Sequence, residues 1–119
     1  MNLEFFNRVQ NLVNACPASW ESGDRTVGHN SAIGGAKMSY HLQGLAQDLV
    51  YDSIPLLIQA AKKAKDQGFM GIELDATNYH LHVDGRSTVW HVACFKDGSI
   101  VRKISLIDYL TEYDGGFII

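Results

Sequence analysis

The chain has 119 residues, of which 46% are hydrophobic and 19% are charged, and its formal net charge is −3. This length and composition predict one globular domain over residues 1–119, with a core that needs no disulfide staples, and we expect a monomer. No basic stripe with interleaved aromatic residues points to nucleic acid as a partner, and no apolar run is long enough to cross a membrane.

The N-terminal half of the sequence predicts a helix, a strand and a polar loop. The helix is indicated by apolar residues that share one face: Phe5, Val9, Leu12 and Val13. It ends near Pro17, and a short extended segment surrounds Trp20. Residues 22–40 are rich in Gly, Ser and Asn and predict a loop, and long loops of this kind are often functional. Residues 46–51 alternate as a strand does, with Asp48 on the same face as its small and apolar neighbours.

A second helix follows, and its limits are marked by capping residues. Asp52 or Ser53 is its N-cap, Pro55 lies in its first turn, and Gly68 ends it. Its buried stripe is formed by four residues: Ile54, Leu57, Ile58 and Ala61.

The C-terminal half predicts strands and a last helix. Three segments are strand-like: Phe69–Asp75, Tyr79–Gly85 and Thr88–Phe95. Asp97-Gly98 is a turn signal, Ser105 opens a final helix with a capping box, and Gly115-Gly116 stops it. The fold class is therefore α+β, a small and mostly antiparallel sheet with helices packed on one face.

Neither the N-terminus nor the cysteines indicate an exported protein. The first residues lack a basic segment followed by an apolar run, so no signal peptide is visible and we expect the chain to be made in the cytoplasm. Cys16 and Cys94 lack CxxC spacing and are interpreted as packed thiols, although a single long-range bridge stays open.

The most informative segment is Tyr79 to Asp84, which alternates apolar and polar residues. On a strand this places His80, His82 and Asp84 on one face. A second cluster upstream contains His41 and Asp48. The two clusters supply two histidines and one carboxylate for a zinc ion with another histidine beside them, and three protein ligands with an open position are typical of catalytic zinc.

The neighbours of these residues suit hydrolysis. Zinc would lower the pKa of a bound water to about 7 and polarise a carbonyl group. The imidazole of His80 suits a general base or an oxyanion stabiliser, and Asp84 suits a hydrogen-bond partner that orients a ligating imidazole.

Several segments, in this order, resemble the zinc D-Ala-D-Ala carboxypeptidase family, which includes D-Ala-D-Ala dipeptidases, phage L-alanyl-D-glutamate endolysins and the hedgehog signalling domain. They begin with Ser22-Gly23-Asp24-Arg25-Thr26 and His29-Asn30, and continue with Ile33-Gly34-Gly35-Ala36, Ser39 to Asp48 and His80-Leu81-His82-Val83-Asp84. The resemblance spans about Ser22 to Trp90. It implies a hedgehog/DD-peptidase-like fold and a hydrolase of bacterial peptidoglycan peptide.

The resemblance also implies roles for individual residues. His41, Asp48 and His82 match the zinc ligands, and His80 matches a histidine that acts near the scissile carbonyl. Arg25 matches an arginine beside the cleft, where its planar fork suits a substrate carboxylate or an oxyanion. Two further residues are expected to contact substrate: Ser39 and Trp90.

The sequence departs from the family at the general base. Many relatives carry an acid three residues before the last zinc histidine, where this chain has Tyr79, and hedgehog-type chains carry one six residues before, where it has Ala76. For the base we rank His80 first, Asp75 second and Glu73 third.

Two functions follow from these features. The first is a zinc metallopeptidase of the D-Ala carboxypeptidase, L-alanyl-D-glutamate or DD-endopeptidase type, encoded by a phage or prophage as an endolysin or particle-associated enzyme for cell-wall degradation. It would act on the wall after release, or as part of the particle. The second is a non-catalytic zinc module that binds peptide or uses zinc structurally, as the hedgehog domain does.

Overall fold

A computed structural model describes residues 3–22 and 44–116, which form three helices and six strands. The helices are α1 (Leu3–Ala15), α3 (Ile54–Asp66) and α4 (Leu106–Asp114). The strands are β1 (Trp20–Ser22), β2 (Ala46–Val50), β3 (Gly71–Asp75), β4 (His80–Asp84), β5 (Trp90–Asp97) and β6 (Ile100–Ser105). The predicted loop over residues 22–40 lies almost wholly outside the described residues.

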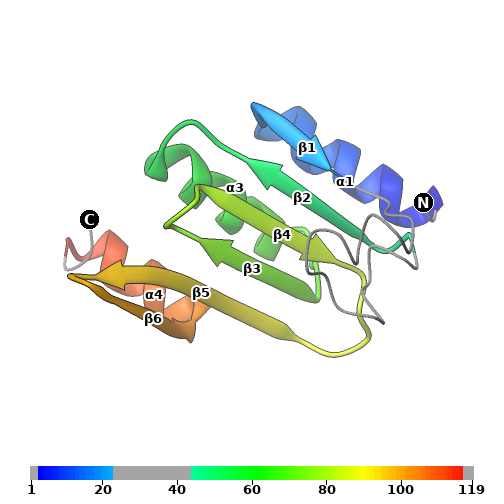
Figure 1. Cartoon of the computed structure of the whole chain (residues 1–119). Coiled ribbons are helices and arrows are strands. Elements are labelled where there is room, and N and C mark those ends of the chain that lie inside the picture. Colours follow the sequence, from blue (N-terminus) through cyan, green and yellow to red (C-terminus); the bar gives the residue numbers. More distant parts are fainter. Residues whose placement is uncertain (1–2, 23–43, 117–119) are drawn as a thin grey trace, which may run out of the picture.

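The strands form one sheet in the order β1-β2-β4-β3-β5-β6 (Figure 1). Four of the neighbouring pairs are antiparallel and one, β3 with β5, is parallel. The α+β class is as predicted, and the sheet is mostly antiparallel, with one parallel pair that makes it mixed. The reason is the short connection 85–89: β4 ends beside the start of β3, and the chain crosses there to the other side of β3 before β5 begins.

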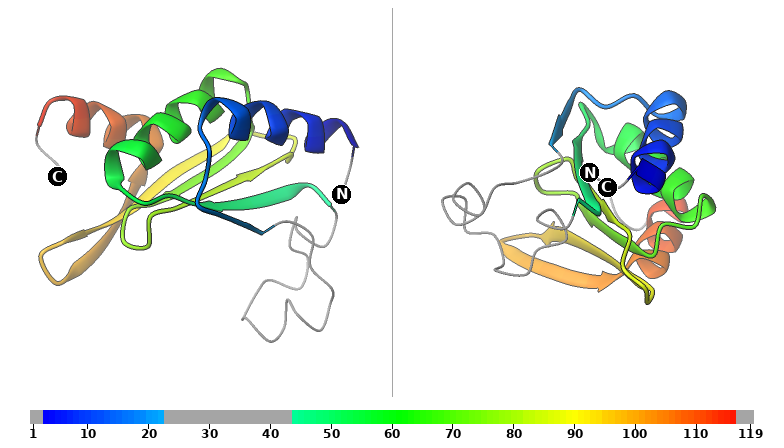
Figure 2. Two further views of the ribbon diagram at one scale, coloured as in Figure 1. Left: turned by 90° about the horizontal axis from the view of Figure 1, so that it is seen from above. Right: turned by 90° about the vertical axis from the view of Figure 1, so that its right-hand side faces the viewer.

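All three helices cover the same face of the sheet (Figure 2). Strand residues that alternate toward the helices are buried: Leu49, Ile72, Leu74, Leu81, Val83 and Ala93. The helices bury their apolar stripes against them: Phe5, Val9 and Leu12 from α1, Leu57, Ile58 and Ala61 from α3, and Leu106 and Tyr109 from α4. We call the sheet surface turned away from these helices the far face.

Local sequence signals fix the limits of the later elements. Ser53 caps α3, because its side chain accepts a hydrogen bond from the Leu56 backbone N–H. Ser105 caps α4 in the same way, through the Asp108 N–H. Gly98 has φ +65 in the turn between β5 and β6, a conformation that glycine adopts without strain. Among the described residues, no helix is long and apolar enough to cross a membrane.

Candidate metal centre

The far face of β4 carries the histidines singled out in the sequence. Leu81 and Val83 are fully buried under the helices, so the intervening residues His80, His82 and Asp84 point to the opposite face. This confirms the alternation that the sequence predicts.

Strand pairing extends this group across the centre of the sheet. His82 pairs with Asp48 of β2 on one side and with Glu73 of β3 on the other. Directly opposed residues on one face hold their side chains within about 5 Å of each other at Cβ. Strands β2, β4 and β3 lie side by side (Figure 1), and their pairing therefore aligns three ionisable residues across them.

The imidazole of His82 lies between two carboxylates. Its Nδ1 is 2.9 Å from Asp48 Oδ1, and its Nε2 is 2.7 Å from Asp84 Oδ2. A carboxylate at Nε2 fixes the orientation of the ring and aims Nδ1 at Asp48, which is how metal-binding histidines are commonly held.

Asp84 is itself clamped by the residues around it. Its carboxylate is fully buried and accepts hydrogen bonds from Arg86, through Nε at 2.8 Å and Nη2 at 2.6 Å as well as the backbone N–H at 3.2 Å. The guanidinium lies over the Trp90 ring, 4.4 Å from the ring centre. Gly71 leaves the space for this carboxylate, because a Cβ there would overlap it.

The charges of the site follow from this packing. Burial disfavours the protonated His82 ring, but hydrogen bonds and charges from Asp48 and Asp84 outweigh burial and raise the pKa of His82 to about 9. Burial also opposes ionisation of Asp84, yet hydrogen bonds from Arg86 and His82 hold the pKa of Asp84 well below its usual range. His82 therefore carries a proton at Nδ1 unless a metal ion replaces it.

The residues at the other end of β4 are less buried. His80 Nε2 is 3.3 Å from Asp48 Oδ1, and the His80 side chain is 29% exposed. Asp75 uses both carboxylate oxygens in the turn that follows β3. Its Oδ1 accepts from the Thr77 and Asn78 N–H groups, and its Oδ2 accepts from Asn78 Nδ2.

Asp48 and His82 fit a zinc site. They offer the oxygen and nitrogen donors that zinc prefers, and zinc holds such donors at about 2.0–2.2 Å. The two donor atoms lie 2.9 Å apart, so Asp48 and His82 would hold a zinc ion together. Within residues 3–22 and 44–116 no group of three or more His, Cys, Asp or Glu side chains is arranged to hold a metal. The third predicted ligand, His41, lies outside the described residues.

Comparison with protein families agrees with this geometry. The family model described as Peptidase M15 matches residues 1–84, which include both clusters. The chain belongs to the Peptidase M15 family. This confirms the predicted resemblance to the zinc D-Ala-D-Ala carboxypeptidases and indicates a metallopeptidase. No curated protein matches the chain.

Of the other predicted M15 site residues, Trp90 is the one that the structure describes. It lies at the start of β5, pairs with Gly71, and has Lys103 Nζ 5.2 Å from its ring centre in addition to Arg86. Two residues predicted to contact substrate, Arg25 and Ser39, lie outside the described residues.

Two residues of the site were missed in the sequence. Arg86 holds Asp84 and stacks on Trp90, and Gly71 makes room for the carboxylate. The signal for Arg86 is its position two residues beyond Asp84, which continues the alternation of the strand. Gly71 gives no such signal, because its role depends on strand pairing.

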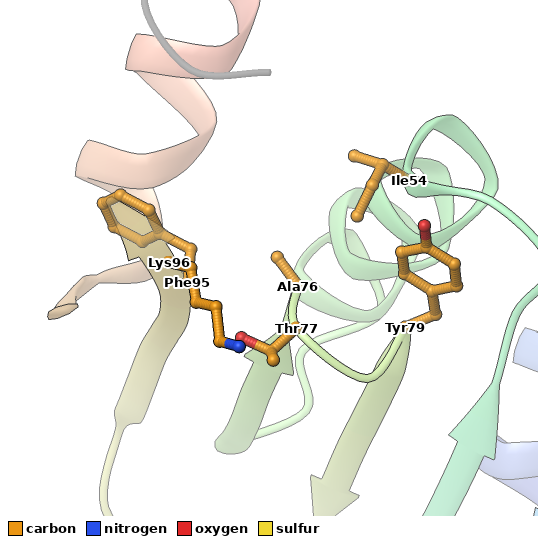
Figure 3. A pocket seen from close by; sticks show the side chains of 6 residues that line it. All are labelled: Ile54, Ala76, Thr77, Tyr79, Phe95 and Lys96. Atoms are coloured by element: carbon orange, nitrogen blue, oxygen red, sulfur yellow. The ribbon is translucent and has the colours of Figure 1, made fainter. Parts of the chain in front are cut away.

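A pocket of about 320 Å³ lies beside the turn between β3 and β4 (Figure 3). Its lining residues are Ile54, Ala76, Thr77, Tyr79, Phe95 and Lys96. Figure 3 shows the Lys96 side chain extending from β5 toward that turn. The lining includes neither Asp48 nor His82, but Tyr79 immediately precedes His80. The pocket is therefore lined by the β3–β4 turn, α3 and β5, and no residue of the candidate metal site lines it.

Proposed function

We propose that the protein is a zinc-dependent peptidase that hydrolyses a peptide bond in the stem or cross-link of bacterial peptidoglycan. The observation that carries the proposal is the His82 ring, held at Nε2 by Asp84 and aimed at Asp48 through Nδ1, in a chain of the Peptidase M15 family. The bond is of the D-Ala carboxypeptidase, L-alanyl-D-glutamate or DD-endopeptidase type.

The proposed zinc ligands are His41, Asp48 and His82. When bound, zinc lowers the pKa of a water molecule and polarises a carbonyl group. Asp84 accepts a hydrogen bond from the Nε2–H group of His82. The proton therefore stays on Nε2, and the lone pair of Nδ1 is available for the metal. Arg86 neutralises the buried Asp84 carboxylate and keeps it in place.

The remaining predicted residues act on the substrate in this proposal. His80, beside Asp48, is placed to stabilise the carbonyl oxygen as negative charge develops on it. Arg25 pairs with a substrate carboxylate, while Ser39 and Trp90 contact the peptide. We further propose that the enzyme is encoded by a phage or prophage and reaches the wall after release from the cytoplasm or as part of a particle.

The test is digestion of purified bacterial sacculi with and without a chelator, with released fragments identified by mass spectrometry. We expect a new peptide end that disappears with chelator and returns with zinc. His82→Ala and His41→Ala are each expected to abolish zinc binding and hydrolysis. Hydrolysis that survives either substitution would contradict the proposed ligand set.

A second function, a non-catalytic zinc module, is favoured by one observation. The positions where relatives carry the acid hold Tyr79 and Ala76, and the Asp75 carboxylate is taken up by its own turn. In that case chelation would lower the melting temperature and no product would form. With zinc at 100 times its dissociation constant, the expected stabilisation is about 2.7 kcal/mol for either function.

A further inference from the structure

Glu73 completes the row of ionisable side chains on the far face. It lies on β3 between Ile72 and Leu74, which are both fully buried, so its side chain points to the same face as His82. The register places it directly opposite His82, on the side away from Asp48. Glu73 thus flanks one proposed zinc ligand as Asp48 does, from the other neighbouring strand.

The three other carboxylates on this part of the far face already have defined partners. Asp48 faces His82 and His80, and Asp84 is buried between His82 and Arg86. Asp75 accepts three hydrogen bonds within its own turn. A carboxylate that must accept a proton from a reacting group needs an oxygen that is not already committed in this way.

Within residues 3–22 and 44–116, Oε2 of the Glu73 carboxylate is such an oxygen. The contact of this carboxylate among the described residues is with Cys94, whose Sγ is 3.5 Å from Oε1. A thiol is a weak donor, so this contact steadies the side chain without strongly engaging it. Burial, together with Glu73 itself, raises the pKa of the Cys94 thiol, which remains neutral beside the carboxylate. The side chain of Glu73 is partly exposed, and strand pairing places it beside His82.

We propose that Glu73 is the general base of the peptidase, in place of the acid that relatives carry at the position of Tyr79. This inference rests on the proposed function. Glu73 takes one proton from the water that attacks the scissile carbonyl carbon. As the C–N bond breaks, the same proton passes from Glu73 to the departing amine, and the products are a new carboxyl group and a new amine. The hydrogen bonds of such a base commonly tighten only when substrate is bound.

The experiment compares zinc-loaded wild-type protein with Glu73→Gln and with Asp75→Asn, which makes the matched amide change at the competing candidate for the base on the same strand and face. Because general acid–base catalysis contributes about 10²- to 10⁴-fold, Glu73→Gln is expected to lower kcat at least about 100-fold with little change in KM. Asp75→Asn is expected to change kcat by less than about 10-fold, because both oxygens of that carboxylate are engaged in its own turn. A larger loss in Asp75→Asn than in Glu73→Gln would make Asp75 the base and overturn the inference.

Zinc binding by titration calorimetry separates a base from a metal ligand. Glu73→Gln should bind zinc within about threefold of wild type, whereas removal of a proposed ligand should abolish binding. Loss of zinc binding in Glu73→Gln would make Glu73 a ligand and overturn the inference. A change in KM without a change in kcat would make Glu73 a substrate-binding residue and would also overturn the inference.

Rescue of Glu73→Ala by added formate separates a base from a residue with only a structural role, because formate can replace a missing base but not a missing structural contact. We expect formate to restore part of the activity of Glu73→Ala and none of that of His82→Ala. If the wild type is active and kcat is unchanged in Glu73→Gln, the inference about Glu73 is overturned and the proposed function is not. An inactive zinc-loaded wild type overturns the proposed function together with it.

Discussion

The two ends of β4 present the same kinds of side chain in opposite surroundings. At its C-terminal end the Asp84 carboxylate is fully buried and is held by His82 and Arg86. At its N-terminal end His80 is 29% exposed, and the neighbouring Asp75 carboxylate forms the turn that leads into the strand. The buried end is therefore suited to fixing a metal ligand, and the exposed end to meeting a substrate.

The difference shows that burial decides how much stability is lost when a carboxylate loses its partner. Breaking a buried, hydrogen-bonded ion pair leaves an uncompensated charge and costs about 3–5 kcal/mol, whereas exposed pairs contribute about 0–1 kcal/mol. Substitutions at the two ends of β4 should therefore lower the free energy of unfolding by amounts that differ by several kcal/mol, although they change similar atoms. We expect the effects to decrease in the order Gly71, Asp84, Arg86 and Tyr79.

The largest effect is expected at Gly71. Gly71→Ala places a methyl group where the Asp84 carboxylate lies, so it must displace Asp84 from Arg86 and His82. We expect a loss of about 3 kcal/mol or more in the free energy of unfolding, measured by urea denaturation. Gly98→Ala is the control, because Gly98 has no neighbour within 4 Å and loses only about 1 kcal/mol through its positive φ. Equal losses in the two variants would mean that Asp84 is not clamped as described.

The next largest effect is expected for Asp84→Asn, which keeps the size of the side chain and removes its charge. Arg86 then loses its buried counter-ion, and His82 loses the acceptor that orients it. We expect a loss of about 2–3 kcal/mol in stability and a 10- to 100-fold weaker zinc affinity by titration calorimetry. Asp75→Asn, at the exposed end, should cost less than about 1 kcal/mol and leave zinc affinity unchanged. Similar zinc affinities for the two variants would show that Asp84 does not support the metal site.

How much of this site could be predicted from the sequence depends on the range of the interaction. The far-face placement of His80, His82 and Asp84 is confirmed, because it depends only on the period of a strand. The capping of α3 by Ser53 is local in the same sense. The approach of Asp48 to His82 joins two clusters far apart in the sequence; the residue types predicted a shared zinc site, and the family resemblance assigned the individual ligands.

The remaining features depend on contacts between strands that no local pattern encodes. The parallel pairing of β3 with β5 follows from where the short connection 85–89 delivers the chain. The overlap that any side chain at Gly71 would meet depends on its register with Asp84. Strand β6 was not predicted, because it is largely exposed and lacks the alternation of a half-buried strand.

A smaller effect is expected for Arg86→Lys. Lysine keeps the positive charge but cannot reproduce the two parallel hydrogen bonds from Nε and Nη2 to Asp84. We expect a loss of about 1–2 kcal/mol in stability, less than for Asp84→Asn, because the buried carboxylate keeps a counter-ion. Thermal unfolding checks this order. A loss in Arg86→Lys as large as in Asp84→Asn would show that geometry rather than charge holds Asp84.

The smallest effect, and the one of opposite sign, is expected at Tyr79, in the exposed turn before His80. Its φ of +56 lies in the left-handed region, which costs most residues about 1–2 kcal/mol but which Asn adopts more readily. Its side chain is 42% exposed, so little packing is lost on substitution. Tyr79→Asn should therefore raise the free energy of unfolding by about 0.5–1 kcal/mol. If Tyr79 also lines a substrate pocket, the same variant should bind peptide more weakly as it becomes more stable, whereas unchanged peptide binding would restrict Tyr79 to the turn. A stabilising change at the exposed end of β4, set against the losses at the buried end, would show that backbone strain is stored at the exposed end of the strand.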